Sequence, residues 1–256
     1  MIPPDLTRHA RFICSPNDQD LHRTFPEHSA FQANSAEGEE NISKLRRILN
    51  AYSAFDPAVG YCQGMNFIAG TLLVFLEEEA AFYTFLMLMQ RASEPLRSIF
   101  LPDMKEALLT FGVLHELTRT HLPKLARHFR RLDVTCDMFC TEWYMTLFSR
   151  SFPVSLCARI LDILLAEGDG KIIHRIALTL LKSDQKTLLA IDDMGELVMR
   201  LKQLPEDAKN WPSDGAGDFV VAAYRMKLSR AEIVKIRKAL SSSSSSSVEE
   251  PRRGNF

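Results

Sequence analysis

Apolar residues recur along most of the chain at the spacing of an amphipathic helix. Leu45, Ile48, Leu49 and Tyr52 follow the i, i+3, i+4, i+7 pattern, which brings them to one helix face. The polar–apolar alternation that is typical of half-buried strands is absent from the sequence. We therefore predict an all-α fold. The expected helices cover residues 42–55, 65–76, 80–89, 102–119, 156–166, 172–182, 187–204 and 229–240.

The segments between these helices carry turn and loop residues. Residues 34–41 are acidic and contain a glycine, so we expect an exposed loop there. Residues 57–76 lack any charge, but proline, glycine and amide residues interrupt them, which favours a loop entering a buried helix over a membrane span. Residues 241–247 are all serine. We predict one domain over residues 1–240 and a disordered serine-rich tail over 241–256.

Composition excludes several functional classes. Of the 256 residues, 46% are hydrophobic and 25% are charged, as in soluble globular proteins. The net charge of −1 gives no global field that would favour nucleic acid as a partner. Five cysteines are too few for a disulfide scaffold, and Cys136 and Cys140 lack a second Cys or His pair, so we predict no metal site. We expect no signal peptide or transmembrane segment, and these 256 residues contain no glycine-rich phosphate loop.

Two short segments could carry chemistry. Asp20 precedes Arg23 by three residues, so on a helix the carboxylate could orient the guanidinium. A surface ion pair of little energetic value explains the same spacing. The second segment, residues 59–66, places an amide and a phenol between two glycines just before a long apolar helix. It could form either a helix-cap network or a contact site.

The same residues resemble the TBC domain family, which comprises all-helical GTPase-activating modules for Rab-type small GTPases. Residues 20–26, Asp-Leu-His-Arg-Thr-Phe-Pro, resemble the family's IxxDxxRTFP box. Residues 59–66, Val-Gly-Tyr-Cys-Gln-Gly-Met-Asn, resemble its YxQGMN box. A third motif is matched by the segment from Trp143 to Phe148 and by the segment from Arg159 to Asp162. The three blocks have the family's order and spacing over about residues 17–205.

The resemblance implies roles for individual residues. Arg23 would enter the site of a GTP-bound Rab as an arginine finger, and Gln63 would orient the attacking water in place of the GTPase's own glutamine. Asp20 would hold the arginine box in shape, and Tyr61 and Asn66 would shape the glutamine loop. The remaining motif residues would be supporting or structural: Gly64, Thr24, Phe25, Pro26, Trp143, Phe148 and Asp162.

The resemblance also implies the setting. This chain would need no cofactor, because the partner GTPase would hold GTP and Mg²⁺. The protein would act in the cytoplasm in vesicle trafficking, with peripheral association with endomembranes as an open alternative to a purely soluble state. These chemical roles suit the residue types, since phosphoryl transfer requires positioning and charge stabilisation.

The sequence departs from the family pattern at three places. Asn17 stands where the arginine box has an isoleucine, which weakens an apolar anchor, and Leu161 replaces a tryptophan of the third motif. Only thirteen residues, 7–19, separate the opening Ile2-Pro-Pro-Asp-Leu6 from Asp20, so the N-terminal part of the domain is expected to be shortened. The alternative function is therefore a catalytically inactive TBC fold that binds a GTPase or serves as a scaffold.

Overall fold

The computed structural model describes residues 16–90, 96–207 and 216–245, and every regular element within these ranges is helical. This confirms the all-α fold. The predicted shortening at the N-terminus lies outside the described residues. The α-helices are α2 (Asp18–His22), α3 (Ala36–Phe55), α4 (Met65–Phe75), α5 (Glu78–Gln90), α6 (Leu96–Ile99), α7 (Lys105–His121), α8 (Pro123–Arg131), α9 (Asp137–Met145), α10 (Val154–Glu167), α11 (Lys171–Ser183), α12 (Gln185–Ala190), α13 (Met194–Asp207), α14 (Ala216–Tyr224) and α15 (Arg230–Ser245), and η2 (Ser29–Phe31) is a 3₁₀ helix.

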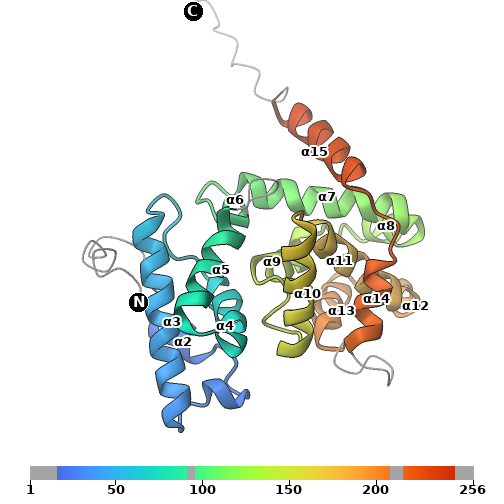
Figure 1. Ribbon diagram of the computed structural model, residues 1–256. Coiled ribbons are helices and arrows are strands. Elements are labelled where there is room, and N and C mark those ends of the chain that lie inside the picture. Colours follow the sequence, from blue (N-terminus) through green and yellow to red (C-terminus); the bar gives the residue numbers. More distant parts are fainter. Residues whose placement is uncertain (1–15, 91–95, 208–215, 246–256) are drawn as a thin grey trace, which may run out of the picture.

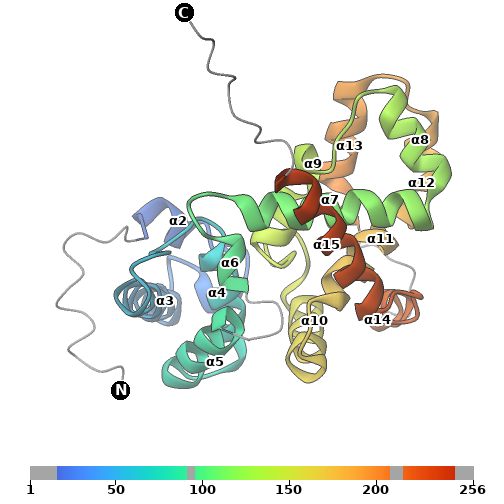
Figure 2. The same cartoon turned by 90° about the horizontal axis from the view of Figure 1, so that it is seen from above.

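The helices form two groups along the chain (Figures 1 and 2). One end of the molecule contains α2 to α5, and the other contains α8 to α14. In the first group α3 packs against both α4 and α5. In the second, α11 packs against α7, α10, α13 and α14, and α15 lies against α7. Helix α4 packs against α10, and this contact joins the two groups. It brings residues 57–64, which precede α4 and contain Gln63, close to the second group.

Helix α3 confirms the apolar pattern but starts earlier than predicted. Leu45, Ile48 and Leu49 are at most 1% exposed. The acidic residues 36–41 form the first turns of the helix and not an exposed loop. The Ser35 hydroxyl accepts a hydrogen bond from the backbone N–H of Gly38 at 3.0 Å, and this cap together with acidic residues in the first turn stabilises a helix start.

The stretch predicted as one helix over 187–204 is two helices. Helix α12 ends at Ala190 and α13 starts at Met194. The buried His128 ring contacts the Ile191 carbonyl at 2.9 Å, and the Asp193 carboxylate accepts from the backbone N–H of Glu196 at 2.8 Å. Asp193 therefore caps α13, a helix-start signal that the apolar periodicity masked.

The predicted tail boundary also needs correction. Helix α15 continues to Ser245, so the first five serines of the predicted disordered tail are helical. The hydroxyls of Ser241 and Ser242 donate to the carbonyls of Arg237 and Lys238 at 2.9 and 2.8 Å. These bonds satisfy the hydroxyls within the helix. The rest of the predicted tail, residues 246–256, lies outside the described residues.

The charge-free stretch over residues 57–76 is a loop followed by a buried helix, as predicted. Residues 57–64 form the loop, and α4 is buried over nearly all its length. Among the described residues, no helix combines the length and the apolar character needed to cross a bilayer. The apolar run therefore serves the core of the fold.

Candidate functional site

The arginine segment is a short helix with a polar start. The Asn17 side chain accepts from the backbone N–H of Asp20 at 2.7 Å and caps α2. Asn17 is expected to weaken an apolar anchor, because the family has an isoleucine there. In the structure it is a favourable N-cap for α2. Helix α2 ends at His22, and Arg23 is its C-cap, with a side chain that is 37% exposed. The guanidinium thus leaves the helix end at the surface.

The residues after Arg23 fasten this helix end to α4. Thr24 is 1% exposed, whereas Pro26 is exposed. Phe25 has a positive φ of 49° and packs edge-on against Phe67 with ring centroids 5.8 Å apart. A Cβ on Gly70 of α4 would lie 2.6 Å from the Thr24 methyl group. Only a glycine at that position lets the turn lie so closely on the helix.

The glutamine loop depends on a glycine for its shape. Gly64 has a φ of +110°, and a Cβ there would lie 2.6 Å from the carbonyl oxygen of Met145 at the end of α9. Both the backbone conformation and the close approach exclude a side chain. The loop is therefore pressed against the third motif, and the Gln63 side chain is left exposed.

A buried polar network joins the two segments. The Tyr61 hydroxyl donates to the Asp20 carboxylate at 2.8 Å. The Asn66 amide donates to the Asp20 carbonyl at 3.0 Å and to the Thr24 hydroxyl at 2.9 Å. The Asn66 amide oxygen accepts from the backbone N–H of Gly64 at 3.2 Å. Asn66 therefore bridges the two segments, with two hydrogen bonds to the arginine segment and one from the glutamine loop.

Burial governs the chemistry of this network. Burial, together with the hydrogen bond to Asp20, raises the pKa of Tyr61 well above its ordinary value. The phenol therefore stays protonated and acts as a donor. The Asp20 carboxylate binds Tyr61 through one oxygen and the Arg23 guanidinium through the other, at 2.5 Å. Asp20 consequently ties the surface arginine to the buried network.

Arg23 and Gln63 lie side by side at the surface. With the Gln63 carboxamide turned so that its oxygen faces Arg23, that oxygen accepts from both terminal nitrogens of the guanidinium, at 3.1 Å from Nη1. The buried Nε of Arg23 has no hydrogen-bond partner within the described part of the chain. The arrangement places a permanent positive charge and a primary amide next to each other at the surface. The buried Asp20 carboxylate holds the charged group in position.

The third motif lies outside this pair of side chains. Trp143 and Phe148 are at most 2% exposed and pack together with ring centroids 5.7 Å apart. Both side chains belong to the core, beneath the glutamine loop that Met145 contacts at Gly64. Asp162 is exposed and lies 3.8 Å from Arg159 on α10, an ion pair on the surface. Among the described residues, Asp162 forms no hydrogen bond or ion pair with Arg23 or Gln63, and Leu161 beside it is buried.

Sequence reasoning misinterpreted Asn17 and missed Gly70 and Met145, and all three build the site. An asparagine before Asp18 and Asp20 is a helix-start signal that could have been used. Gly70 inside an apolar helix indicates close approach of another segment. The Met145 contribution is a backbone carbonyl, and no side-chain pattern could have indicated it.

Replacing Asn66 with alanine should lower the free energy of unfolding by about 3 kcal/mol, because buried partners in both segments lose their hydrogen bonds. Urea unfolding of the purified chain measures this. Asn50→Ala is the matched control, since the buried Asn50 amide oxygen has no hydrogen-bond partner among the described residues, and its removal should cost little. Equal stability losses in the two variants would contradict the proposed importance of the network.

Replacing Gly64 with alanine should cost about 2–4 kcal/mol of stability through the strained φ and the contact with Met145. Gly112→Ala is the control, because its Cβ would meet only a Leu240 methyl group at 3.1 Å. That variant should be neutral or stabilising by up to about 1 kcal/mol, since alanine favours a helix over glycine. Thermal and urea unfolding of both variants decide the question, and a Gly64→Ala protein as stable as the parent would refute it.

Comparison with known proteins agrees with this geometry. The family model for the Rab-GTPase-TBC domain matches residues 15–189. The human ecotropic viral integration site 5 protein homolog is 35% identical over 233 residues, covering 91% of this chain and 27% of that protein. The Caenorhabditis elegans Rab GTPase-activating protein tbc-11 is 31% identical over 237 residues, covering 90% of this chain and 25% of that protein. The chain thus spans about a quarter of the length of these relatives.

Solved structures show the same fold. The Chlamydomonas flagellar RabGAP TBC domain superimposes with a TM-score of 0.66 at 30% identity, covering 87% of this chain and 71% of that chain. The Ypt/Rab-GAP domain of Gyp1p gives a TM-score of 0.63 at 17% identity, covering 86% of this chain and 77% of that chain, and indicates the fold alone. On the family match, the two sequence boxes and the helical architecture together, this chain belongs to the Rab-GTPase-TBC domain family.

Proposed function

We propose that this chain is a GTPase-activating module for a Rab-family GTPase in its GTP form, and that Arg23 and Gln63 act in trans. The observation that carries the proposal is the contact between these two exposed side chains, 40 positions apart in the sequence. Both come from segments that one buried network holds together. Membership of the family and the GTPase-activating role named for tbc-11 support the same function.

The proposed mechanism follows from the two functional groups. The Arg23 guanidinium carries a permanent charge on a planar fork, which suits the oxygens that gain negative charge during phosphoryl transfer. The Gln63 carboxamide can accept from the attacking water and donate to a phosphate oxygen at the same time. Asp20 positions the guanidinium from its buried side. The GTPase would hold GTP and Mg²⁺, so the chemistry would be completed only in the complex.

The setting of this activity is part of the proposal. GTP-loaded Rab proteins reside on the cytoplasmic face of membranes, and we propose that the chain acts there, either from the cytoplasm or in peripheral association with endomembranes. Its action would end the GTP-bound state of the Rab and so regulate vesicle trafficking.

Single-turnover phosphate release from a panel of GTP-loaded Rab proteins tests the proposal. At least one Rab should hydrolyse GTP about 10³-fold faster or more with the chain present, as arginine fingers generally achieve. Acceleration of none of them would contradict a catalytic role. GTP-dependent capture of a Rab without acceleration would select the alternative, a TBC fold that binds but does not activate.

A further inference from the structure

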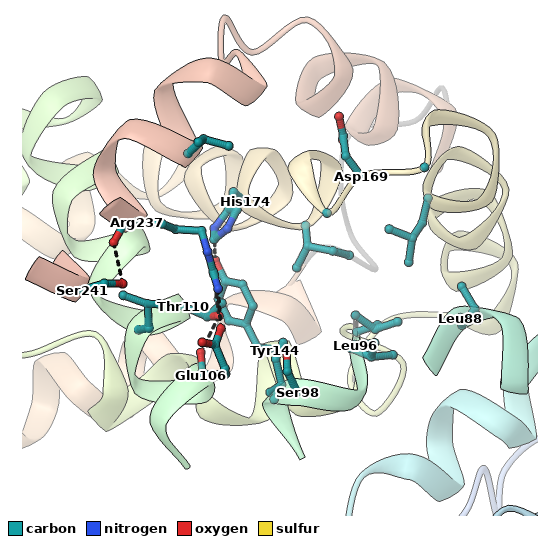
Figure 3. A pocket seen from close by; sticks show the side chains of 18 of the residues that line it. Leu88, Leu96, Ser98, Glu106, Thr110, Tyr144, Asp169, His174, Arg237 and Ser241 are labelled. Atoms are coloured by element: carbon teal, nitrogen blue, oxygen red, sulfur yellow. Dashed lines mark hydrogen bonds and ion pairs between the residues drawn. The ribbon is translucent and has the colours of Figure 1, made fainter. Parts of the chain in front are cut away.

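A cavity of about 820 Å³ lies between α7, α15 and the connection from α10 to α11 (Figure 3). Pockets of this size hold drug-sized ligands. None of the residues of the arginine segment or the glutamine loop lines it. The cavity is therefore separate from the Arg23–Gln63 site, and the proposed function leaves it unexplained.

One end of the cavity is mainly apolar, although Asp169 also lies on that side (Figure 3). Leu88 of α5, Leu96 of α6 and Leu164 of α10 contribute to its walls, and Figure 3 places Leu88 and Leu96 on the side away from α15. Aliphatic walls offer water few hydrogen-bond partners. An apolar chain that displaces this water gains free energy from the hydrophobic effect.

The opposite end is polar and positively charged. Arg237 and Lys238 of α15 line it, together with Glu106 of α7. Figure 3 shows Arg237 and Glu106 in contact at this end. Lys238 is exposed, and no ion pair joins it to another described residue. Glu106 balances Arg237, so the charge of Lys238 is left for an anion.

The remaining ionisable groups add no net charge to the cavity. The Tyr144 hydroxyl and His174 Nδ1 lie 2.6 Å apart, and burial, together with the Arg237 charge, lowers the pKa of His174 to about 3. This imidazole is therefore neutral near pH 7. The Asp169 carboxylate is 3.4 Å from the Lys171 ammonium, which compensates it.

From this separation of apolar and cationic ends, we propose that the cavity binds a single-chain amphiphile with an anionic head, of the long-chain fatty acid class. The hydrocarbon chain lies among the leucines of α5, α6 and α10. The carboxylate lies at the α15 end, where Lys238 attracts it and Arg237 is at hand as a hydrogen-bond donor. Because α15 forms one wall, bound amphiphile also fastens this helix to α7.

Titration calorimetry of the full chain with monomeric oleate tests the site. We expect saturable binding of one oleate per chain. Lys238→Glu should weaken oleate binding about tenfold at low salt, because attraction becomes repulsion at the rim. Lys235→Glu is the matched control, since Lys235 is exposed on the same helix and does not line the cavity. The same Lys238→Glu change should not weaken binding of oleylamine, which carries the opposite charge.

A second pair of variants tests the apolar end without relying on charge. Leu164→Trp should fill the cavity and abolish oleate binding, whereas Leu165→Trp, one residue further along α10 and not in the lining, should retain it. Circular dichroism and thermal unfolding establish that both variants fold. Absence of saturable oleate binding to the parent chain, or equal binding by the two tryptophan variants, would overturn the proposal.

The same chemistry could be supplied by a free fatty acid or by one acyl chain of a bilayer lipid. Flotation with phosphatidylcholine vesicles distinguishes these sources. Oleate binding without vesicle binding supports the proposed free acid. Vesicle binding that Leu164→Trp abolishes would overturn the single-chain, anionic ligand class, because phosphatidylcholine has two acyl chains and no net charge. The measurements require no GTPase.

Discussion

Replacing Arg23 with lysine should lower the GTP hydrolysis that the chain stimulates by about 10³-fold, within the range that an arginine finger contributes. Lysine keeps the positive charge but presents a compact ammonium in place of a planar fork. It cannot bind two phosphate oxygens in the same geometry. Single-turnover phosphate release from the responsive Rab, measured at saturating amounts of the chain, gives the rate of the chemical step.

The fold should tolerate this change. The Arg23 side chain is 37% exposed, but its partner Asp20 is only 9% exposed, so the fold depends on a positive charge beside that carboxylate, and lysine keeps this charge. The lysine ammonium still lies near the Asp20 carboxylate, so no buried charge is left alone. Arg131→Lys is the control, because Arg131 of α8 is 56% exposed and forms an ion pair of the same 2.5 Å length with the exposed Asp192. An Arg23→Lys protein as active as this control would exclude the arginine finger.

Replacing Gln63 with alanine should lower the stimulated rate by about 10²–10³-fold, the cost of removing one positioned hydrogen-bonding group from a transition state. The expected loss is in the chemical step and not in stability, because Gln63 is exposed and its side chain contacts Arg23 at the surface. Unchanged thermal unfolding and slower phosphate release would together support the assignment.

Three further variants sharpen the Gln63 test. Gln63→Glu preserves the shape of the side chain but adds a negative charge 3.1 Å from the Arg23 guanidinium, which should neutralise the finger and slow hydrolysis at least as much. Gln203→Ala, on the exposed surface of α13, should have no effect. The double variant Arg23→Lys/Gln63→Ala should lose less than the product of the single losses, since groups that act as a unit are not additive. Full activity of Gln63→Ala would mean that the GTPase supplies its own glutamine.

Much of the fold could be predicted from local pattern. The apolar face of α3 is a property of residues three and four apart, so its core positions can be identified without tertiary information. The same holds for the start of α15, because Ser229 and Glu232 have the spacing of a capping box, and the Ser229 hydroxyl accepts from the backbone N–H of Glu232 at 3.2 Å. Errors arose where two local signals competed. At residues 191–193 the apolar spacing continued across a break that the Asp193 cap creates.

The candidate site was predictable in its residues but not in its geometry. Asp20 and Arg23 are three residues apart in the sequence, which predicts a contact between their side chains. In the structure the Asp20 carboxylate lies 2.5 Å from the Arg23 guanidinium. The motif resemblance supplied Gln63, Tyr61 and Asn66 without a position in space. Nothing in their spacing indicates that one asparagine would hydrogen-bond both segments.

The sequence by itself determined the helical class, the main core positions and the family motifs, because each depends on residues that are neighbours along the chain. The tertiary structure alone decided that Gln63 lies beside Arg23, that Met145 presses against Gly64, and that a cavity opens between α7 and α15. These features join residues that are distant in sequence. They depend on how whole helices pack, and packing is settled by the shapes of all the buried side chains together.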